Sequence, residues 1–354
     1  MILTAITAED HLLSISPEMS KASLIELRKT TIFHCPACLQ PVKLKVGNVK
    51  IAHFSHTPSA TCTSFFSENE SPHHLQGKWQ FYSFFQSLGY SVTLEHYLPS
   101  IQQRPDLLVT RNGRSIAIEV QRSTIPIEHV NERTNGYASI GIETCWILAQ
   151  SVKVLSNYDH QVVRISLSDF QQSFIHDNTC IVYDVELKTF HYYSSLHYLG
   201  GNQFLARHST LPLRLQTFPF RQVGQCRPET VATLHSKWQA RRMIHLQQLM
   251  KRNRQGIQHP ILRACYQLGV YPTELPNYIG IPIEGAEIIH RHPVEWQLLL
   301  YEALSHNSHI SIETFFQHTM SQPGTDKVVD VVFQYAEFLL KVVPFRHLPS
   351  VAKR

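Results

Sequence analysis

The chain has 354 residues, a length that predicts two or three domains and at least one sizeable hydrophobic core. Hydrophobic residues make up 43% of the chain and charged residues 17%, proportions that exclude a wholly disordered protein. The formal net charge of +5 is unevenly distributed, because residues 201–263 contain eleven Lys and Arg and a single acid, Glu229. This stretch therefore carries +10 and the rest of the chain −5. So basic a stretch predicts a polyanionic partner, with nucleic acid favoured over a membrane.

The start of the chain and its cysteines predict a cytoplasmic protein. Glu9 and Asp10 come early and no basic stretch precedes them, which argues against a signal peptide. No run of about 18 apolar residues is present, so we expect no membrane-spanning helix. The seven cysteines are odd in number and do not form the pattern of a disulfide framework. They favour a reducing compartment and one metal site near the N-terminus.

Residues 1–69 are predicted to form a small zinc-ribbon-like module, with the Cys-Pro-Ala-Cys stretch as a tight zinc knuckle. The candidate zinc ligands are Cys35, Cys38, His53, His56 and Cys62. A hairpin over residues 43–54 would return the histidines toward the knuckle. Four ligands close a tetrahedral structural site, and we favour the three cysteines with either histidine. The alternative is that the cysteines are free and buried and the histidines lie on the surface.

Residues 70–152 alternate helical and strand patterns. The predicted elements are a helix over His74–Leu88, strands over Tyr90–Leu98, Pro105–Thr110 and Ser115–Val120, a helix over Ile127–Ile140 and a strand over Thr144–Leu148. With a right-handed crossover to the last strand, this order predicts a small mixed sheet flanked by helices.

The hairpin in this region brings two acidic residues together. A two-residue turn at Asn112-Gly113 places Asp106 opposite Glu119, with Arg104 and Gln121 on the same face. Directly opposed Cβ atoms lie about 4.5–5.5 Å apart, and two carboxylates that close require a proton or a cation between them. Such pairs hold Mg²⁺ beside phosphates. The alternative is a turn role for Asp106 and a solvated pair between Glu119 and Arg104.

The motifs resemble a known nuclease core. Arg104-Pro105-Asp106 followed by Ile118-Glu119-Val120-Gln121 resembles the PD-(D/E)xK pattern of restriction-endonuclease-like folds. The longer string AIEVQRSTI at 117–125 is similar to the competence protein CoiA family. Further residues agree with that family: Glu70-Ser71, His74-Leu75, Lys78, Arg133, Tyr137, Trp146–Leu148 and the CPAC and HFSH motifs. The resemblance covers residues 30–150 well and the C-terminal part more loosely.

The resemblance implies a metal-dependent site. Carried over to this sequence, Asp106, Glu119 and the Val120 carbonyl would hold Mg²⁺ or Mn²⁺, with Glu70 or His74 as a further contributor. The family acts on DNA taken up during natural transformation and promotes its recombination.

The positive charge of the predicted site differs from the usual motif. Gln121 stands where a lysine is usual, and it brings no positive charge and cannot act as a base. Lys78, one helical turn after His74, is a candidate for the missing cation, and the alternative is a solvated helix lysine. Arg133 and Tyr137 lie four residues apart and are candidates for phosphate or active-site contact. The alternative is a surface arginine packed on a tyrosine.

Residues 153–354 are predicted to form a basic, mainly helical domain. A hairpin is expected over Cys180–Val185 and Thr189–Tyr193, followed by helices over Glu229–Arg254, Ile261–Leu268, Val294–Ser305, Ile312–Met320 and Asp326–Val342. Together with Arg104, Arg133 and Tyr137, the candidate DNA contacts are Lys237, Arg241, Arg242, Lys251, Arg252 and Arg254 on the long helix. The alternative is a solvated charged helix face.

The sequence thus predicts a mixed α+β and α/β protein in three parts: 1–69, 70–152 and 153–354. The predicted function is Mg²⁺-dependent endo- or exonuclease processing of single-stranded or branched DNA during transformation, with a recombinase as a candidate partner. The alternative function is a degenerate nuclease fold that holds DNA or a recombinase without cutting. In a weaker third hypothesis, the basic stretch packs against an acidic protein.

Overall fold

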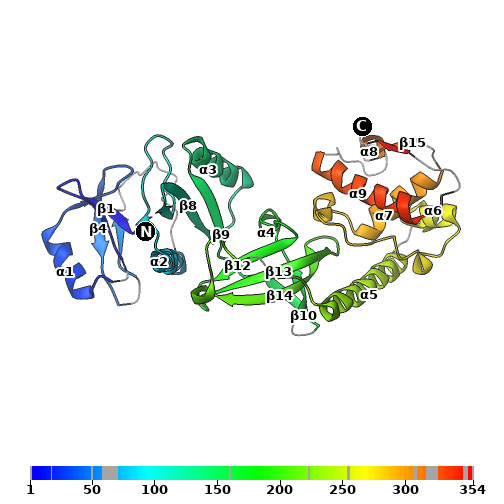
Figure 1. The fold of residues 1–354 in the computed structure, drawn as a ribbon, viewed down its shortest axis with the longest axis horizontal. Helices are drawn as coiled ribbons and strands as arrows, with labels where there is room; N and C mark the ends of the chain where they lie inside the picture. The colour runs from blue at the N-terminus through cyan, green and yellow to red at the C-terminus, as the bar shows by residue number, and fades with distance from the viewer. Residues whose placement is uncertain are drawn as a thin grey trace. The chain divides into compact units, whose positions relative to one another are not determined.

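Figure 1 shows the fold in a computed structural model. The structure describes residues 2–16, 18–48, 51–57, 71–158, 161–221, 224–252, 256–306, 309–315, 326–345 and 350–352. Three predicted site residues, Cys62, Glu70 and Arg254, lie outside the described residues. The chain divides into two compact units, Met1–Ser151 with Ile181–His191 and Thr210–Gln222, and Val152–Cys180 with Tyr192–Ser209 and Val223–Arg354. Among the described helices, none combines the length and the apolar character needed to cross a membrane.

The first unit opens with a five-stranded antiparallel sheet of order β2-β1-β3-β4-β5. Its elements are β1 (Thr4–Thr7), β2 (Leu12–Ser14), α1 (Lys21–Thr30), β3 (Phe33–His34), β4 (Pro41–Lys45) and β5 (His53–His56). The predicted hairpin is confirmed, because β4 pairs with β5 through Leu44 and Phe54. Phe54 and Phe33 are buried and pack against each other in the core of this sheet.

The second sheet of this unit has the predicted element order. It consists of α2 (Pro72–Ser87), β6 (Ser91–Leu94), β7 (Leu107–Arg111), β8 (Arg114–Gln121), α3 (Ile127–Ser139) and β9 (Glu143–Leu148). The strand order is β6-β7-β8-β9, with β6, β7 and β8 antiparallel and β9 parallel to β8. The first strand ends at Leu94, earlier than predicted, because Glu95 adopts a left-handed conformation with φ +49°.

The turn between β7 and β8 sets the predicted register. Asn112 and Gly113 both have positive φ, +52° and +74°, as a tight hairpin turn requires. Arg111 then pairs with Arg114 and Leu107 with Ile118, so the register, continued by one residue, brings Asp106 beside Glu119.

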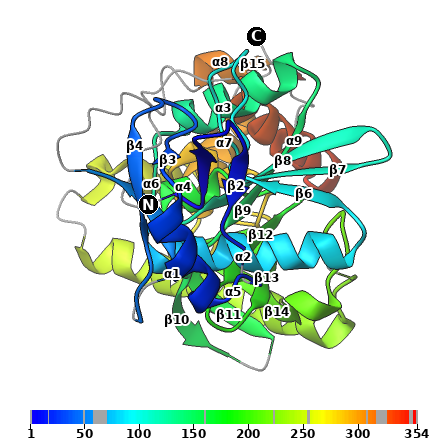
Figure 2. The ribbon, with the colours of Figure 1, turned by 90° about the vertical axis from the view of Figure 1, so that its left-hand side faces the viewer.

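The two helices cover opposite faces of this sheet. A Cβ on Gly77 of α2 would lie 3.3 Å from Val120, whereas Tyr137 of α3 reaches the neighbouring Glu119. Because neighbouring strand residues point to opposite faces, α2 and α3 lie on the two sides of β8. Figure 2 shows strand β8 between α3 and α2. The helices therefore bring side chains to β8 from both sides.

Helix α2 also contacts the rest of the first unit. The Trp79 indole donates a hydrogen bond to the Ile15 carbonyl in the N-terminal region, at 3.2 Å. Buried Phe81 packs against Tyr183 and Phe190, with ring centroids 4.7 and 6.0 Å away. These contacts explain why residues 181–191 belong to the first unit although they are distant in sequence.

The remaining described chain begins with a five-stranded sheet and ends with helices. The sheet, of order β10-β11-β14-β13-β12, contains β10 (Lys153–Asn157), β11 (Val162–Ser166), β12 (Thr179–Asp184), β13 (Thr189–Tyr198) and β14 (Gln203–Pro212), with α4 (Asp169–Gln172). The elements that follow are η1 (Leu213–Leu215), α5 (Pro228–Arg252), η2 (Gly256–Gln258), α6 (Pro260–Leu268), η3 (Pro272–Glu274), η4 (Ala286–Ile289), α7 (Pro293–His306), β15 (His309–Ser311), α8 (Ile312–Phe315), α9 (Asp326–Val342) and β16 (Ser350–Ala352). The predicted hairpin over residues 180–193 is thus part of a larger sheet.

We expect Gly113→Ala to destabilise the protein by about 1–2 kcal/mol, because a side chain at positive φ is strained. Gly47→Ala is the matched control, since Gly47 lies outside this conformational region and has open space around its Cβ position. The free energy of unfolding in urea measures both variants. Equal effects of the two substitutions would contradict the tight turn.

Candidate active site and metal centre

Asp106, at the start of β7, is held by the neighbouring strand and by α2. Its Oδ2 accepts the Val120 N–H at 2.8 Å and lies 3.1 Å from His74 Nε2. Its Oδ1 lies 2.8 Å from the Lys78 ammonium. His74 and Lys78 share one face of α2 because they lie four residues apart. Burial alone would raise the pKa of Asp106, but Lys78 and His74 hold it well below its usual range.

Glu119, in β8, is held by two residues of α3. Its Oε1 accepts hydrogen bonds from the Tyr137 hydroxyl, at 2.5 Å, and from Arg133. Arg133 also donates to the Arg104 carbonyl, at 3.1 Å. Burial raises the pKa of Glu119 and the nearby Asp106 charge adds to this, against the opposing effect of Arg133. Among the described residues, no hydrogen bond reaches the other oxygen, Oε2, which leaves this oxygen available to a ligand.

A third carboxylate, Glu95, completes the cluster, and no sequence motif singles it out. The Lys78 ammonium lies 2.9 Å from Glu95 Oε1, and both side chains are only 1% exposed. The Arg104 guanidinium lies 3.8 Å from Glu95 Oε2. The positive charges of Lys78 and Arg104 lower the pKa of Glu95, although burial alone would raise it. The site therefore holds three carboxylates rather than two.

Several alternatives from the sequence are wrong. Lys78 is not a solvated helix lysine, and Glu119 does not lie on a solvated face, because both side chains are buried. Arg104 is also buried and faces Glu95, which corrects its expected place as a DNA contact. The Gln121 amide donates to the Ser123 carbonyl at 2.6 Å, within its own loop. Positive charge at Asp106 thus comes from α2 and not from β8.

Asp106 and Glu119 fit a hard divalent cation such as Mg²⁺ or Mn²⁺. Such ions take oxygen ligands, and Mg²⁺ is commonly bound through one or two carboxylates together with water and substrate phosphates. A carboxylate offers about four acceptor positions, and each of these two retains at least one. Val120, the third predicted ligand, adjoins both and fixes Asp106 through its N–H.

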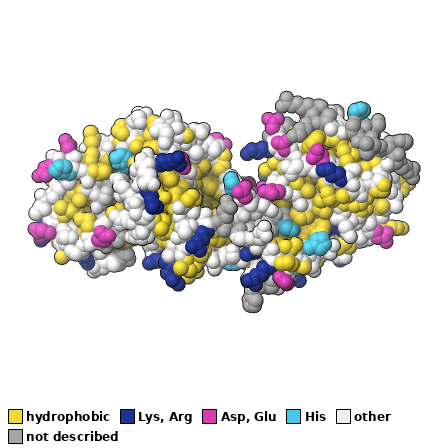
Figure 3. Space-filling model, viewed as in Figure 1, with side chains coloured by type: hydrophobic (Ala, Val, Ile, Leu, Met, Phe, Trp, Pro, Cys, Tyr) yellow, Lys and Arg dark blue, Asp and Glu magenta, His cyan; other side chains and the backbone are white. Residues whose placement is uncertain are grey.

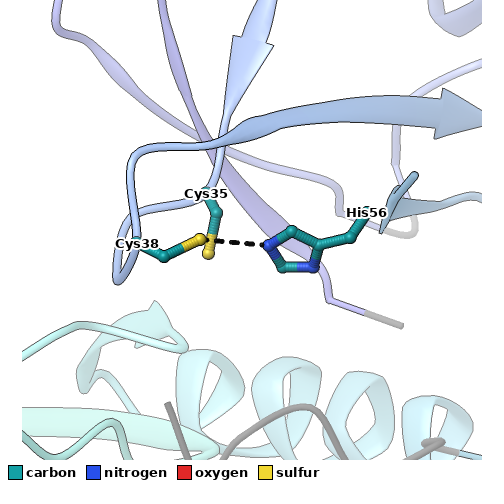
Figure 4. Close-up of side chains that lie close together, drawn as sticks. All are labelled: Cys35, Cys38 and His56. Carbon is teal, nitrogen blue, oxygen red and sulfur yellow. Dashed lines mark hydrogen bonds between the residues drawn. The ribbon is translucent and has the colours of Figure 1, made fainter. Parts of the chain in front are cut away.

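The N-terminal knuckle forms a second candidate metal centre (Figure 4). Atoms of Cys35, Cys38 and His56 lie within 4.8 Å of one another, and Cys38 Sγ lies 3.3 Å from His56 Nε2. His53 is not in this group, and its Nδ1 lies 2.8 Å from the Ile51 carbonyl. The structure thus selects His56 from the two predicted histidines. Two thiolates and an imidazole are typical zinc ligands, and Cys62, the fourth predicted ligand, lies outside the described residues.

The basic residues of α5 are only partly exposed. Arg242 is buried and donates to the carbonyls of Leu275, Pro276 and Ile279 at 2.7–2.8 Å. Its charge is therefore internal, which corrects its expected place on a DNA-binding face. Figure 3 shows Lys and Arg side chains dispersed among other side chains on the visible face.

The other predicted basic residues of α5 fall into two groups. Arg241 donates to the Tyr158 hydroxyl at 2.9 Å, and the Lys237 ammonium lies 5.2 Å from the centre of the same ring. Lys251 and Arg252 are exposed at the end of the helix. DNA binding by this helix remains a prediction.

Two regions of the chain are similar to known proteins. The family model "Competence protein CoiA, nuclease-like domain" matches residues 70–226, and "Competence protein CoiA, N-terminal domain" matches residues 17–65. The competence protein CoiA of Bacillus subtilis (strain 168) is 35% identical to the chain over 119 residues. That match covers 34% of this chain and 32% of the relative, so the chain matches about a third of the relative's length. No solved structure matches the chain significantly.

We expect His56→Ala to abolish zinc binding and His53→Ala to retain it, because only His56 lies with the two thiols. Zinc content of the purified proteins, measured by mass spectrometry, gives the result directly. A zinc-site variant should also lose thermal stability, because a structural site contributes binding energy to folding. Full zinc retention in His56→Ala would contradict the assignment.

Asp106 should make stability depend on acid pH. Its pKa is lowered in the folded protein, so the unfolded chain binds a proton first as the pH falls. The stability that Asp106 contributes is present above its ordinary pKa of about 4 and is lost on acidification. In Asp106→Asn, the free energy of unfolding should therefore decline less steeply between about pH 5 and pH 3.

Urea unfolding at several pH values measures this slope. Asp177→Asn is the control, because the Asp177 side chain is 76% exposed, and its slope should follow that of the wild-type protein. An unchanged or steeper slope in Asp106→Asn would show that this carboxyl is not held ionised.

Proposed function

Because the chain belongs to the CoiA family of competence proteins, we propose that it processes incoming DNA during natural transformation by metal-dependent phosphodiester hydrolysis. The proposed fold of residues 70–152 is the PD-(D/E)xK type, since the order of one helix, three strands, a helix and a parallel strand agrees with it. The observation that carries the proposal is the convergence of Asp106, Glu119 and Lys78 at the end of one hairpin.

In this proposal, Asp106 and Glu119 hold Mg²⁺ or Mn²⁺. When bound, the metal ion lowers the pKa of a water molecule and neutralises charge on the scissile phosphate. Tyr137 and Arg133 fix Oε1 of Glu119 and leave Oε2 for the ligand. Lys78 fixes Oδ1 of Asp106 and supplies the positive charge that Gln121 lacks.

We propose that His74 acts beside Asp106 as the helix contributor to the site. Its ring nitrogen contacts Oδ2 of Asp106, and its side chain is partly accessible to solvent. The exposed Lys251 and Arg252 remain candidates for contact with the DNA backbone, where they would act without reading sequence. The substrate we propose is single-stranded or branched DNA in the cytoplasm, with a recombinase as the candidate partner.

A second candidate function is favoured by the charge balance of the site. Arg133 and Lys78 pair with both predicted metal-binding carboxylates, and Gln121 is turned toward Ser123. A degenerate nuclease fold that binds DNA or a recombinase without cutting would tolerate this arrangement. The two functions differ in whether Glu119 is required for cleavage.

The test is a cleavage assay with single-stranded, duplex and branched DNA in the presence of Mg²⁺ or Mn²⁺. Glu119→Ala and Lys78→Met should each reduce cleavage at least about 100-fold, because they remove a metal ligand and the only lysine contacting Asp106 among the described residues.

The matched control is Glu128→Ala, an exposed acid in the first turn of α3, which should cleave like the wild-type protein. Cleavage that persists in Glu119→Ala, or no cleavage by the wild-type protein, would exclude the enzyme hypothesis. DNA binding without cleavage would favour the second function.

A further inference from the structure

We infer that Glu95 is a positioning residue of this site: it holds the Lys78 ammonium against Asp106, and the start of the N-terminal sheet holds Glu95 in turn. The inference rests on the proposed function, because it concerns the same site. It assigns a role to a carboxylate outside the sequence motifs and makes the N-terminal module part of the site's support.

The Lys78 side chain is almost completely buried. A lysine side chain that is 1% exposed loses its hydration, and its ammonium is stable only when it is well paired. Lys78 meets this need with two carboxylates, Glu95 at 2.9 Å and Asp106 at 2.8 Å. A lysine has four rotatable side-chain bonds, so a single anion would fix its ammonium less well than two.

The backbone of Glu95 is tied to that of Asp106. Its left-handed conformation ends β6, and its N–H donates to the carbonyl of Asp106 at 3.0 Å. The two acidic residues are therefore joined through the main chain and again through the Lys78 ammonium. Any shift of Glu95 would disturb both of these links to Asp106.

The other carboxylate oxygen of Glu95 faces a separate set of donors. Its Oε2 accepts the Leu3 N–H at 2.9 Å and the Thr4 hydroxyl at 3.2 Å, with Arg104 3.8 Å away. Thr4 begins β1, Leu3 directly precedes it, and both residues are fully buried. A buried carboxylate is stable only with such partners, so the N-terminal sheet fixes the orientation of Glu95.

The charges of this group also balance. Glu95 and Asp106 supply two negative charges, and Lys78 and Arg104 supply two positive ones. Removing the Glu95 charge leaves one carboxylate against the two cations Lys78 and Arg104, so Lys78 should no longer be held between two anions. A purely structural role for Glu95 would change stability but would not change the rate of the reaction selectively.

The experiment compares full-length Glu95→Gln, Glu95→Asp and the wild-type protein on the DNA that the wild-type protein cleaves. We expect kcat of Glu95→Gln to fall at least about tenfold while KM stays within about twofold, because Glu95 acts on the reacting site and not on DNA binding. Glu95→Asp keeps the charge and should recover part of kcat. Glu143→Gln, an exposed acid on β9, is the matched control and should behave like the wild-type protein.

The support from β1 is tested on the same strand. Thr4→Val removes the hydroxyl that contacts Glu95, and we expect it to lower kcat by about threefold. Thr7→Val is the matched control, since within the described parts of the chain the Thr7 hydroxyl accepts a hydrogen bond only from the His11 N–H in the adjacent turn. Equal kcat values for the two variants would overturn the role of the N-terminal sheet.

A double-mutant cycle supplies a readout that is independent of cleavage. If Glu95 positions Lys78, the losses in thermal midpoint caused by Glu95→Gln and Lys78→Met should exceed, in sum, the loss in the double variant. Additive losses, or a wild-type kcat in Glu95→Gln, would overturn the inference. Absence of cleavage by the wild-type protein would remove the proposed enzyme function instead, and the cycle alone would then decide whether Glu95 holds Lys78.

Discussion

The need to pair buried charges governs the structure around the candidate active site. The basic members are Lys78, Arg104 and Arg133, and the acidic members are Glu95, Asp106 and Glu119. An unpaired charge removed from water costs several kcal/mol, so none of these side chains can be placed independently of the others. The cluster takes its members from two helices, a hairpin and the loop after β6, and it draws further donors from the N-terminal strand. Those elements must therefore assemble together around it.

The hairpin is the part of this cluster that local sequence controls. A register shifted by one residue would move Asp106 away from the Val120 N–H and turn Glu119 away from Arg133 and Tyr137. Positive φ at Asn112 and Gly113 prevents such a shift, and buried residues on the other face reinforce it. Because α2 and α3 then approach β8 from its two faces, Lys78 reaches one carboxylate and Arg133 the other.

The sequence predicts local features well, but it predicts poorly which charged side chains are buried. The element order, the hairpin register and the Cys35–Cys38 knuckle all follow from patterns within short segments. The sequence alone groups Arg104 and Arg242 with the candidate DNA contacts, because burial of a long side chain depends on distant partners, here a carboxylate and a group of carbonyls. The net charge of +10 in residues 201–263 therefore overstates the positive charge available to a polyanion.

In the proposed PD-(D/E)xK motif, glutamine occupies position 121 where a lysine is usual, and this bears on the role of the third carboxylate. A lysine at position 121 would extend from the strand beside its own carboxylates, with solvent close by, whereas Gln121 turns into its loop. Lys78 restores the positive charge from α2, but only from a position that is almost completely buried. Asp106 is already shared with His74 and the Val120 N–H, so a second anion is required to keep the ammonium in place. Glu95 is that anion, and its own burial then requires the donors that the N-terminal sheet provides.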